Sequence, residues 1–323
     1  MAITLADAQV NTQDDIDFHV IDEYRKQSAQ VLNRITFDDS VSPGTAGASL
    51  VYGYTRVKTE RGAAFRAQNT EYTASEAKRE RFTVPLSPLG GTYKVDRVLA
   101  NLGNAQTNEI VFQQGQLVKS SVARFVDEFI NGVEADFADA SPGFDGIDAA
   151  VTGTSTESFA TGTTAHDFST IADKTDALNA KRAITAWLRT MDGIDVIYGN
   201  ADGVAVLEYI ADLIGFYNTT KDDWGQVVST FRDIPFVDLG AKSGSSTDII
   251  ETDAVTGVTS LYGVRFGLDG VHGASVAGAD LLQQWLPDFS TSGAVKTGEV
   301  ELGPVGLAVK ATKSAGAFRV KVQ

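Results

Sequence analysis

The sequence contains no cysteine, so disulfide bonds, thiolate zinc sites and thiol nucleophiles are all excluded. It has only three histidines, His19, His166 and His272, and their spacing matches neither a metal site nor a catalytic triad. Single histidines in polar surroundings are most often solvated or cap a helix, which is what we expect of these three. No Walker loop, HExxH or GxSxG motif occurs either. These absences predict a protein that is not an enzyme and that uses no cofactor or metal.

Long apolar runs are missing as well. No stretch approaches the about 18 consecutive apolar residues that a membrane-spanning helix requires. Residues 1–18 have neither the positively charged region nor the uninterrupted apolar core of a signal peptide. We therefore expect a protein that is made in the cytoplasm and contacts no membrane.

Positive charge is scarce over the whole chain but concentrated in one segment. The chain has 27 Lys and Arg against 42 Asp and Glu, a formal net charge of −15, which argues against a general nucleic-acid binder because neutralising phosphates requires a surplus of cations. Residues 1–40 carry eight acids against three bases, whereas residues 56–81 carry seven cations against four anions. A basic segment in an acidic chain indicates pairing between copies of the protein, although a solvated face explains the charge equally well. The candidate intersubunit contacts are the seven cations Arg56, Lys58, Arg61, Arg66, Lys78, Arg79 and Arg81.

Pairs of acidic residues offer the one route to hydrolytic chemistry. They occur at Asp14–Asp15, Asp38–Asp39 and Asp222–Asp223, and in the pair of Glu299 with Glu301. Carboxylate pairs serve glycosidases and metal sites, so a carboxylate-dependent hydrolase is an alternative reading. Adjacent carboxylates in turns more often solubilise the chain or cap helices. The glycines between 267 and 273 lack the Lys-Ser/Thr of a phosphate loop, and we interpret them as turn residues.

The first hundred residues predict an arm followed by a long two-stranded excursion. Residues 1–48 are polar and, apart from an amphipathic helix near 18–32, cannot bury enough apolar surface to fold alone. From 49 to 98, apolar and polar residues alternate in two extended limbs on either side of a charged, glutamate-rich tip. An isolated hairpin of that length has little core and is marginal in water. It must therefore dock against a neighbour.

The strongest periodic signal spans residues 106–137, where apolar side chains recur every three or four positions before Pro142 and Gly143. Such a helix would be about 48 Å long at roughly 1.5 Å per residue, more than a compact domain needs, and we interpret it as a spine. After a Thr/Ser/Gly-rich loop, helices and strands alternate from residue 169 on. The expected helices are 171–191 and 201–217, and the expected strands are 195–198, 230–239, 260–267, 295–302, 305–311 and 318–322.

An acidic arm, a basic excursion, a spine helix, an α/β lobe and terminal strands follow one another along the chain. This order resembles the major capsid proteins of tailed bacteriophages, whose Hong Kong 97-type fold is also used by encapsulin shells. Three local sequences are similar to the family as well: RFTVP at 81–85, GFDGI at 143–147, and TFRDIPFV at 230–237, which is similar to the family's G-x-P-V strand. The strand at 260–267 and the final strands complete the resemblance, which covers nearly the whole chain.

The resemblance implies an α+β fold in five parts. These are an N-terminal arm (1–48), an extended β-hairpin loop (49–98), a peripheral domain with the spine helix (99–150), an α/β axial domain (151–285) and terminal strands returning to the peripheral domain (286–323).

The resemblance also implies a function as the major capsid protein. Copies would form pentamers and hexamers of an icosahedral head shell that encloses double-stranded DNA without sequence-specific binding. The shell would be assembled in the bacterial host cytoplasm and become part of the virion, with portal and decoration proteins as further partners. An encapsulin-type shell around an enzyme cargo is the alternative within the same fold.

Two departures from some family members modify these expectations. Some shells of this family join neighbours through an isopeptide bond between a lysine on the extended loop and an asparagine in the peripheral domain. Lys58 and Lys78 could supply the amine, but no asparagine follows Asn218. We therefore predict that copies are held together without covalent bonds. Because only a short arm precedes the extended loop, we also expect a separate scaffolding protein.

Overall fold

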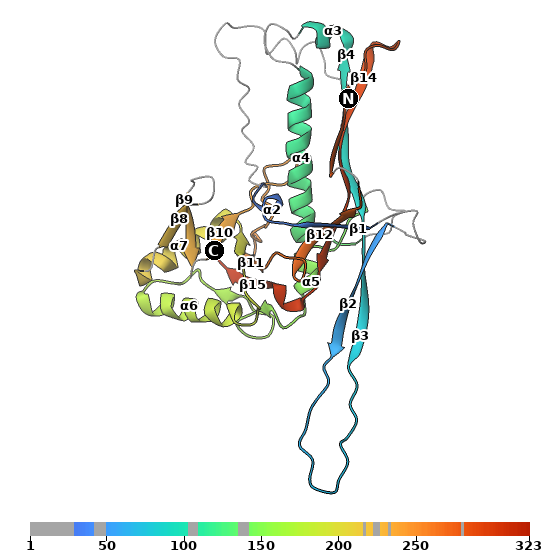
Figure 1. Ribbon diagram of the computed structural model, residues 1–323. Helices are drawn as coiled ribbons and strands as arrows, with labels where there is room; N and C mark the ends of the chain where they lie inside the picture. The colour runs from blue at the N-terminus through green and yellow to red at the C-terminus, as the bar shows by residue number, and fades with distance from the viewer. Residues whose placement is uncertain are drawn as a thin grey trace.

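A long helix and a long strand set the shape of the molecule. In the computed structural model, α4 (Glu109–Asn131) runs beside β4 (Ser87–Asp96) and β14 (Val295–Val309), and an α/β lobe lies to one side of them. A two-stranded hairpin of β2 (Val51–Thr59) and β3 (Lys78–Pro85) extends away from both (Figure 1). Helices and sheets are mixed, which confirms the predicted α+β class. The structure describes residues 29–41, 50–102, 109–134, 142–215, 218–221, 227–231, 234–278 and 281–323.

The longest strand, β14, is the centre of a five-stranded sheet. It pairs antiparallel with the whole of β4 on one side and with two further strands on the other. Two strands were predicted here, at 295–302 and 305–311, but the structure has one, with a shift of register between Leu302 and Val305. Pro304, which cannot donate a backbone hydrogen bond, lies at that irregularity. The other strands of the sheet are β1 (Phe37–Val41), β12 (Val271–Val276) and β13 (Leu282–Trp285).

Helix α4 is shorter than the predicted spine. The periodicity predicted a helix over 106–137, and both ends of that range lie partly outside the described residues, but α4 already ends at Asn131. The cause is Gly132, where a Cβ would lie 2.3 Å from the carbonyl oxygen of Phe144, so only glycine lets the returning chain pack against the helix end. At roughly 1.5 Å per residue the helix is about 35 Å long. Its C-terminal half is buried in the core through Ala123, Phe125, Val126, Phe129 and Ile130.

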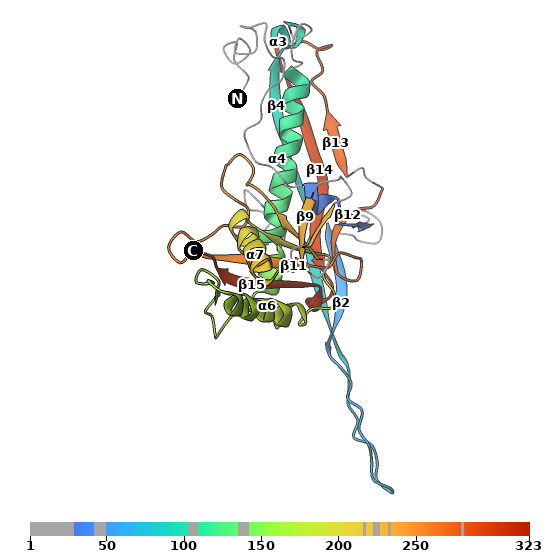
Figure 2. The same ribbon diagram turned by 90° about the vertical axis from the view of Figure 1, so that its left-hand side faces the viewer.

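Eight of the described strands form the sheet of the α/β lobe, in the order β5-β15-β11-β7-β10-β9-β8, with β6 also paired to β15. In the central strand β7 (Val196–Gly199), the neighbouring residues Ile197 and Tyr198 point to opposite faces of the sheet. Ile197 packs with the two helices α6 and α7, whereas Tyr198 packs with core residues of α4 such as Phe129. The two helices therefore cover one face of the sheet, and they lie at the front in Figure 2. The bounds are α5 (Ile147–Val151), β5 (Glu157–Ser158), β6 (His166–Asp167), α6 (Lys174–Leu188), β7 (Val196–Gly199), α7 (Ala201–Ile214), β8 (Asn218–Lys221), β9 (Val227–Phe231), β10 (Ile234–Asp238), β11 (Val258–Val264) and β15 (Ala315–Lys321).

Helix α6 rests directly on two glycines of this sheet. Gly263 and Gly316 lie opposite each other in the ladder between β11 and β15, and a Cβ on Gly263 would lie 3.2 Å from the ring of Trp187. The Trp187 indole nitrogen donates a hydrogen bond of 3.1 Å to the carbonyl oxygen of Thr156. The Asp173 carboxylate caps the N-terminus of α6 by accepting from two backbone N–H groups. Helix α6 is thus held at its start and at its last turn.

Several strands belong to a different sheet from the one that the predicted boundaries imply. Strand β4 falls within the predicted excursion 49–98, yet it pairs with β14 and not with β2. Strands β12 and β13 fall within 151–285 but belong to the five-stranded sheet, and β15 falls within 286–323 but lies in the lobe sheet. The strand predicted over 230–239 is two antiparallel strands, β9 and β10. A local pattern identifies a strand but not its partner, because pairing depends on side chains far apart in the chain.

The predicted arm is described only in part. Residues 1–28 lie outside the described residues, and so does most of the helix predicted over 18–32. Its last four residues form α2 (Ala29–Leu32), which packs against α4 through Val31. Strand β1 follows and pairs parallel with β12.

Candidate intersubunit surface

The hairpin is paired near the body of the molecule and unpaired beyond it. Its strands are in antiparallel register from Val51 opposite Pro85 to Thr59 opposite Lys78, with a bulge just before the last pair. Every residue from 60 to 77 is exposed, and none belongs to a strand. In both ribbon views this segment projects far beyond the rest of the molecule (Figures 1 and 2). It packs against no part of the body that the structure describes, so its surface is available to another molecule.

An aromatic and cationic stack fixes the base of the hairpin to the end of β14. The rings of Tyr54 and Phe82 stack across the ladder with centroids 5.6 Å apart, and the Arg56 guanidinium lies 4.5 Å from the centroid of Phe82. The Tyr54 hydroxyl donates to the carbonyl oxygen of Val309 at 2.9 Å. Arg56 donates to the carbonyl oxygens of Val309 and Lys310 at 2.6 and 2.9 Å. These contacts join residues about 250 positions apart and set the direction in which the hairpin leaves the body.

A second cluster ties the hairpin base to β1 and β12. The Tyr52 hydroxyl donates to the Asp38 carboxylate at 2.8 Å and lies 3.3 Å from Nε2 of His272, whose side chain is fully buried. Burial and the Asp38 carboxylate raise the pKa of the Tyr52 hydroxyl. Burial and the Lys310 ammonium lower the pKa of His272, although Asp38 opposes them. The imidazole is therefore neutral at pH 7, and the charges at this point of the hairpin base are those of the Asp38 carboxylate and the Lys310 ammonium.

The seven predicted contact residues have four different environments. Arg56 serves its own molecule, as described above. Lys58 pairs with Glu80 of the facing strand at 2.9 Å, and both side chains are largely exposed. Arg66 folds back onto the carbonyl oxygen of Thr70 at 3.0 Å. The remaining four are exposed and form no ion pair with any residue that the structure describes: Arg61, Lys78, Arg79 and Arg81. A contact with another copy stays a prediction for the set, and these four are its best candidates.

Two aromatic side chains at the tip are further candidates for an intersubunit contact that the charge pattern of the sequence did not identify. Phe65 is fully exposed, and Tyr72 is 65% exposed with only the Arg66 guanidinium near its ring, at 5.4 Å. They are the only aromatic residues between Tyr54 and Phe82, which is the signal that could have identified them. Aromatic rings and arginines are enriched where protein interfaces form. Rings on a segment without a core of its own therefore mark a docking surface.

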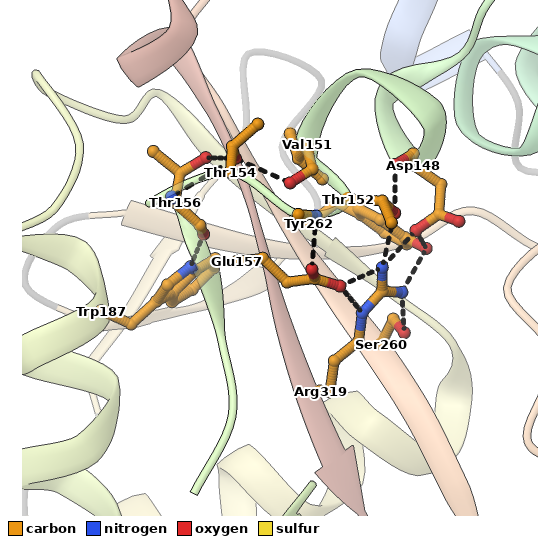
Figure 3. A network of polar contacts seen from close by, with 11 residues as sticks. Asp148, Val151, Thr152, Thr154, Thr156, Glu157, Trp187, Ser260, Tyr262 and Arg319 are labelled. Atoms are coloured by element: carbon orange, nitrogen blue, oxygen red, sulfur yellow. Dashed lines mark hydrogen bonds and ion pairs between the residues drawn. The ribbon is translucent and has the colours of Figure 1, made fainter. Parts of the chain in front are cut away.

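A single arginine of the lobe binds two carboxylates, the enclosed Glu157 and the more exposed Asp148 (Figure 3). Arg319 donates from Nη2 to Asp148 at 2.6 Å, from Nε to Glu157 at 2.9 Å and from Nη1 to the Ser260 hydroxyl at 2.8 Å. The Tyr262 hydroxyl donates to the same Asp148 oxygen at 2.8 Å. Both carboxylates thus form ion pairs with the same guanidinium. The cluster joins α5, β5, β11 and β15, and it was not anticipated from the sequence.

The acid pairs that suggested a hydrolase do not converge on one place. Asp38 binds Tyr52 at the hairpin base, and Glu299 and Glu301 lie on β14, in the five-stranded sheet. Asp14–Asp15 and Asp222–Asp223 lie outside the described residues. Within the described ranges, no group of three or more acidic or histidine side chains is placed to hold a metal ion. No described helix is both long enough and apolar enough to cross a membrane.

The expectation that the histidines are solvated or cap helices is wrong for the two that the structure describes. His272 is buried against Tyr52. The ring of His166 stacks on Phe318 with centroids 4.3 Å apart, and its Nε2 lies 3.1 Å from the Ser158 hydroxyl. Burial lowers the pKa of His166. Both rings pack against aromatic residues from distant strands, which the local sequence does not reveal.

No protein-family model and no curated protein matches this chain. Solved structures with a similar fold do exist. The chain is similar over 100% of its length to 98% of a chain of the holo-SrpI encapsulin complex from Synechococcus elongatus PCC 7942, with 14% identity and a TM-score of 0.62. It is similar to the capsid of Myoviridae Phage XM1 with 14% identity, 99% coverage of both chains and a TM-score of 0.60. It is similar to the capsid of a native GTA particle with 12% identity, 98% coverage of both chains and a TM-score of 0.59. The whole chain thus has the Hong Kong 97-type fold of these shells, as its sequence predicted.

Proposed function

We propose that this chain is the major capsid protein of a tailed bacteriophage, whose copies assemble into the icosahedral head shell around double-stranded DNA. The observation that carries the proposal is the hairpin. Its base is fixed to the body by Tyr54 and Arg56, whereas its tip, with Phe65 and Tyr72, is exposed throughout. A rigid base and an unsupported tip suit an element that folds against another copy. The similarity to capsid structures over almost the whole of both chains supports the same reading.

The parts of the chain have separate roles in this proposal. The hairpin is the extended loop that reaches a neighbour, the sheet around β14 with α4 is the peripheral part, and the lobe with α6 and α7 is the axial part that meets its copies around five-fold and six-fold axes. Exposed ion pairs such as Lys58 with Glu80 contribute only about 0–1 kcal/mol each, so apolar burial at the contacts supplies most of the stability and charge mainly sets register. Many weak contacts repeated by symmetry then hold a closed shell.

The net charge suits a container for DNA. A chain with a formal charge of −15 repels phosphates over most of its surface, so a shell built from it encloses DNA without binding it in a fixed place. A separate scaffolding protein, a portal and decoration proteins belong to the same proposal.

Size-exclusion chromatography of the expressed chain tests the proposal at low cost. A capsid protein elutes as pentamers and hexamers or as megadalton particles. An acid-dependent hydrolase elutes as a monomer or small oligomer, and that result at all protein concentrations would contradict the proposal.

An encapsulin-type compartment is a second candidate because the fold is equally similar to the holo-SrpI encapsulin complex. The contents of particles purified from their natural source distinguish the two. A phage head contains nuclease-protected double-stranded DNA, whereas an encapsulin contains a protein cargo and no protected DNA.

A further inference from the structure

The outer face of α6 carries a row of basic side chains, although Asp173 and Asp176 are also exposed at the start of the helix. Lys174, Leu178, Arg182 and Arg189 follow one another at helical spacing, the last just after the end of the helix, and all four are exposed. We refer to these four residues as the α6 stripe. Its central apolar side chain, Leu178, is 42% exposed and lines a shallow groove together with Arg182 and Arg189. Neither arginine forms an ion pair within the described part of the chain.

The outer face of α7 has the opposite charge. The helix contains no lysine or arginine, and its exposed positions Asp202, Ala205, Tyr209 and Asp212 follow one another at spacings of three and four residues. We refer to these four residues as the α7 stripe. It also has one large apolar side chain near its centre, because Tyr209 is 47% exposed. Each stripe therefore has an apolar side chain near its centre with charged side chains on either side, and the charges of the two stripes are opposite in sign.

The inner faces of both helices are already used. Ala177, Ile184 and Trp187 of α6 and Leu207 and Ile210 of α7 are buried against the lobe sheet. The helices cannot rotate to bury their outer faces in their own molecule. Each stripe is thus a fixed surface.

The stripes also lie at different places on the lobe. Helix α6 forms its lower edge, on the side toward which the hairpin extends, and α7 lies above α6 in both views (Figures 1 and 2). The hairpin carries a surplus of cations between residues 56 and 81, so the basic surfaces of the molecule face one side. The hairpin tip and α6 therefore lie toward the same end of the molecule, although Figure 1 shows them at opposite sides of it.

We propose that neighbouring copies pack head to tail through the lobe, with the α6 stripe of one copy against the α7 stripe of the next. This inference rests on the proposed function and names the contact that closes its rings. A ring requires two different, complementary patches on each copy, and the opposite charges of the two stripes meet that requirement. A two-copy contact through identical patches would bring the α6 stripe against another α6 stripe, or the α7 stripe against another α7 stripe, and the like charges would repel. Leu178 and Tyr209 are then buried at the centre of the contact, and the charges set its register.

Charge reversal tests the pairing. One double variant carries Lys174→Glu with Arg182→Glu, and a second carries Asp202→Lys with Asp212→Lys. Glutamate at 174 lies in the first turn of α6, where a negative charge stabilises the helix. In α7, lysine at 212 in the last turn is stabilising and lysine at 202 in the first turn is destabilising, so the two effects oppose each other. Both variants are therefore expected to fold. A control variant with Lys174→Arg and Arg182→Lys keeps the charge. Native mass spectrometry and electron microscopy of each purified protein, at matched concentration and low ionic strength, report the rings.

The proposal predicts that the control assembles like the wild type and that each reversed variant alone loses its rings. In an equimolar mixture, the first variant has two acidic stripes and the second has two basic ones, so copies alternate around a ring. Strict alternation allows rings with an even number of copies only. The mixture is therefore expected to regain hexamers but not pentamers, and hence no closed icosahedral shell.

The outcomes separate this inference from the proposed function. If the wild type forms neither rings nor shells, the proposed function fails and the inference with it. If the wild type assembles and both reversed variants assemble equally well, the function stands and the inference is overturned. If the variants fail alone and their mixture also stays unassembled, or forms pentamers as readily as hexamers, the pairing of these two stripes is wrong.

Discussion

Removing the two aromatic rings at the hairpin tip should raise the protein concentration needed for assembly without affecting the fold. The change is Phe65→Ser together with Tyr72→Ser. Neither ring belongs to the described core: Phe65 is fully exposed, and Tyr72 is 65% exposed and has a cation–π contact with Arg66. The thermal midpoint of the unassembled variant should therefore equal that of the wild type.

The effect on assembly follows from the apolar area that docking would bury. Fully burying a side chain of this size contributes about 1.5–3 kcal/mol, so the two rings together are worth roughly 3–4 kcal/mol when Tyr72 is counted as already partly covered. At about 1.4 kcal/mol per factor of ten, each hairpin contact weakens a few hundredfold. The protein concentration at which rings or shells first form should rise by about that factor.

Light scattering or mass photometry over a dilution series measures this threshold. The matched control is Phe65→Leu with Tyr72 intact, which keeps an apolar side chain at the tip and should shift the threshold by less than about tenfold. The reasoning is refuted if the double serine variant assembles at the same concentration as the wild type while remaining folded.

Three further predictions concern the body of the protein and the nature of its contacts. Replacing Arg319 with Met leaves the enclosed carboxylate of Glu157 without its ion-pair partner. This change should lower the free energy of unfolding of the unassembled chain by about 3–5 kcal/mol, measured in urea. A loss under about 1 kcal/mol would mean that the cluster in Figure 3 contributes little to stability. Burial and the nearby Lys310 ammonium lower the pKa of His272 below its usual 6.5, so the unfolded chain binds this proton more readily than the folded chain. The free energy of unfolding should therefore fall as the pH drops below about 6.5. His272→Gln should make that fall less steep, and an unchanged slope would contradict a role of His272 in it. Mature shells boiled in denaturant should run as a single band at the monomer mass, since no asparagine follows Asn218 to accept an isopeptide bond from Lys58 or Lys78, whereas a ladder of multimers would refute non-covalent locking.

The sequence predicted well those features that local periodicity determines. The apolar spacing before Asn131 identified α4, and the spacing of Ile184 and Trp187 identified α6, because one face of each helix is buried along its length. The alternation from Val51 on identified the paired base of the hairpin. In each case the signal comes from residues a few positions apart.

Features that depend on distant residues were not predicted. The glycines between 267 and 273 are predicted to be turn residues, and Gly267 and Gly270 do lie in a turn, but Gly273 lies in β12. A Cβ on Gly273 would lie 2.4 Å from the ring of Phe37 in the paired strand β1. The end of α4 was misplaced for the same kind of reason, since Gly132 meets a carbonyl oxygen twelve residues further along the chain. Both positions require glycine because a group distant in the sequence packs closely against the backbone there.

Charge in the sequence identified a candidate surface, on which contact with another copy stays a prediction, but not the chemistry of its side chains. Charge counting selected the hairpin correctly as the basic segment, yet Arg56 is used internally and Lys58 pairs within the hairpin. A cation in a sequence gives no sign of whether its partner lies in the same molecule. The exposed rings of Phe65 and Tyr72 could have been noted from their isolation in a polar segment, but their exposure required the structure.

Negative-stain electron microscopy of the purified wild-type chain tests the central claim most directly, because it images assembly itself. The account predicts closed shells with icosahedral outlines, or rings of five and six copies where a scaffolding protein is needed for closure. A field of separate monomers or small oligomers, at high protein concentration and over a range of ionic strength, would contradict it.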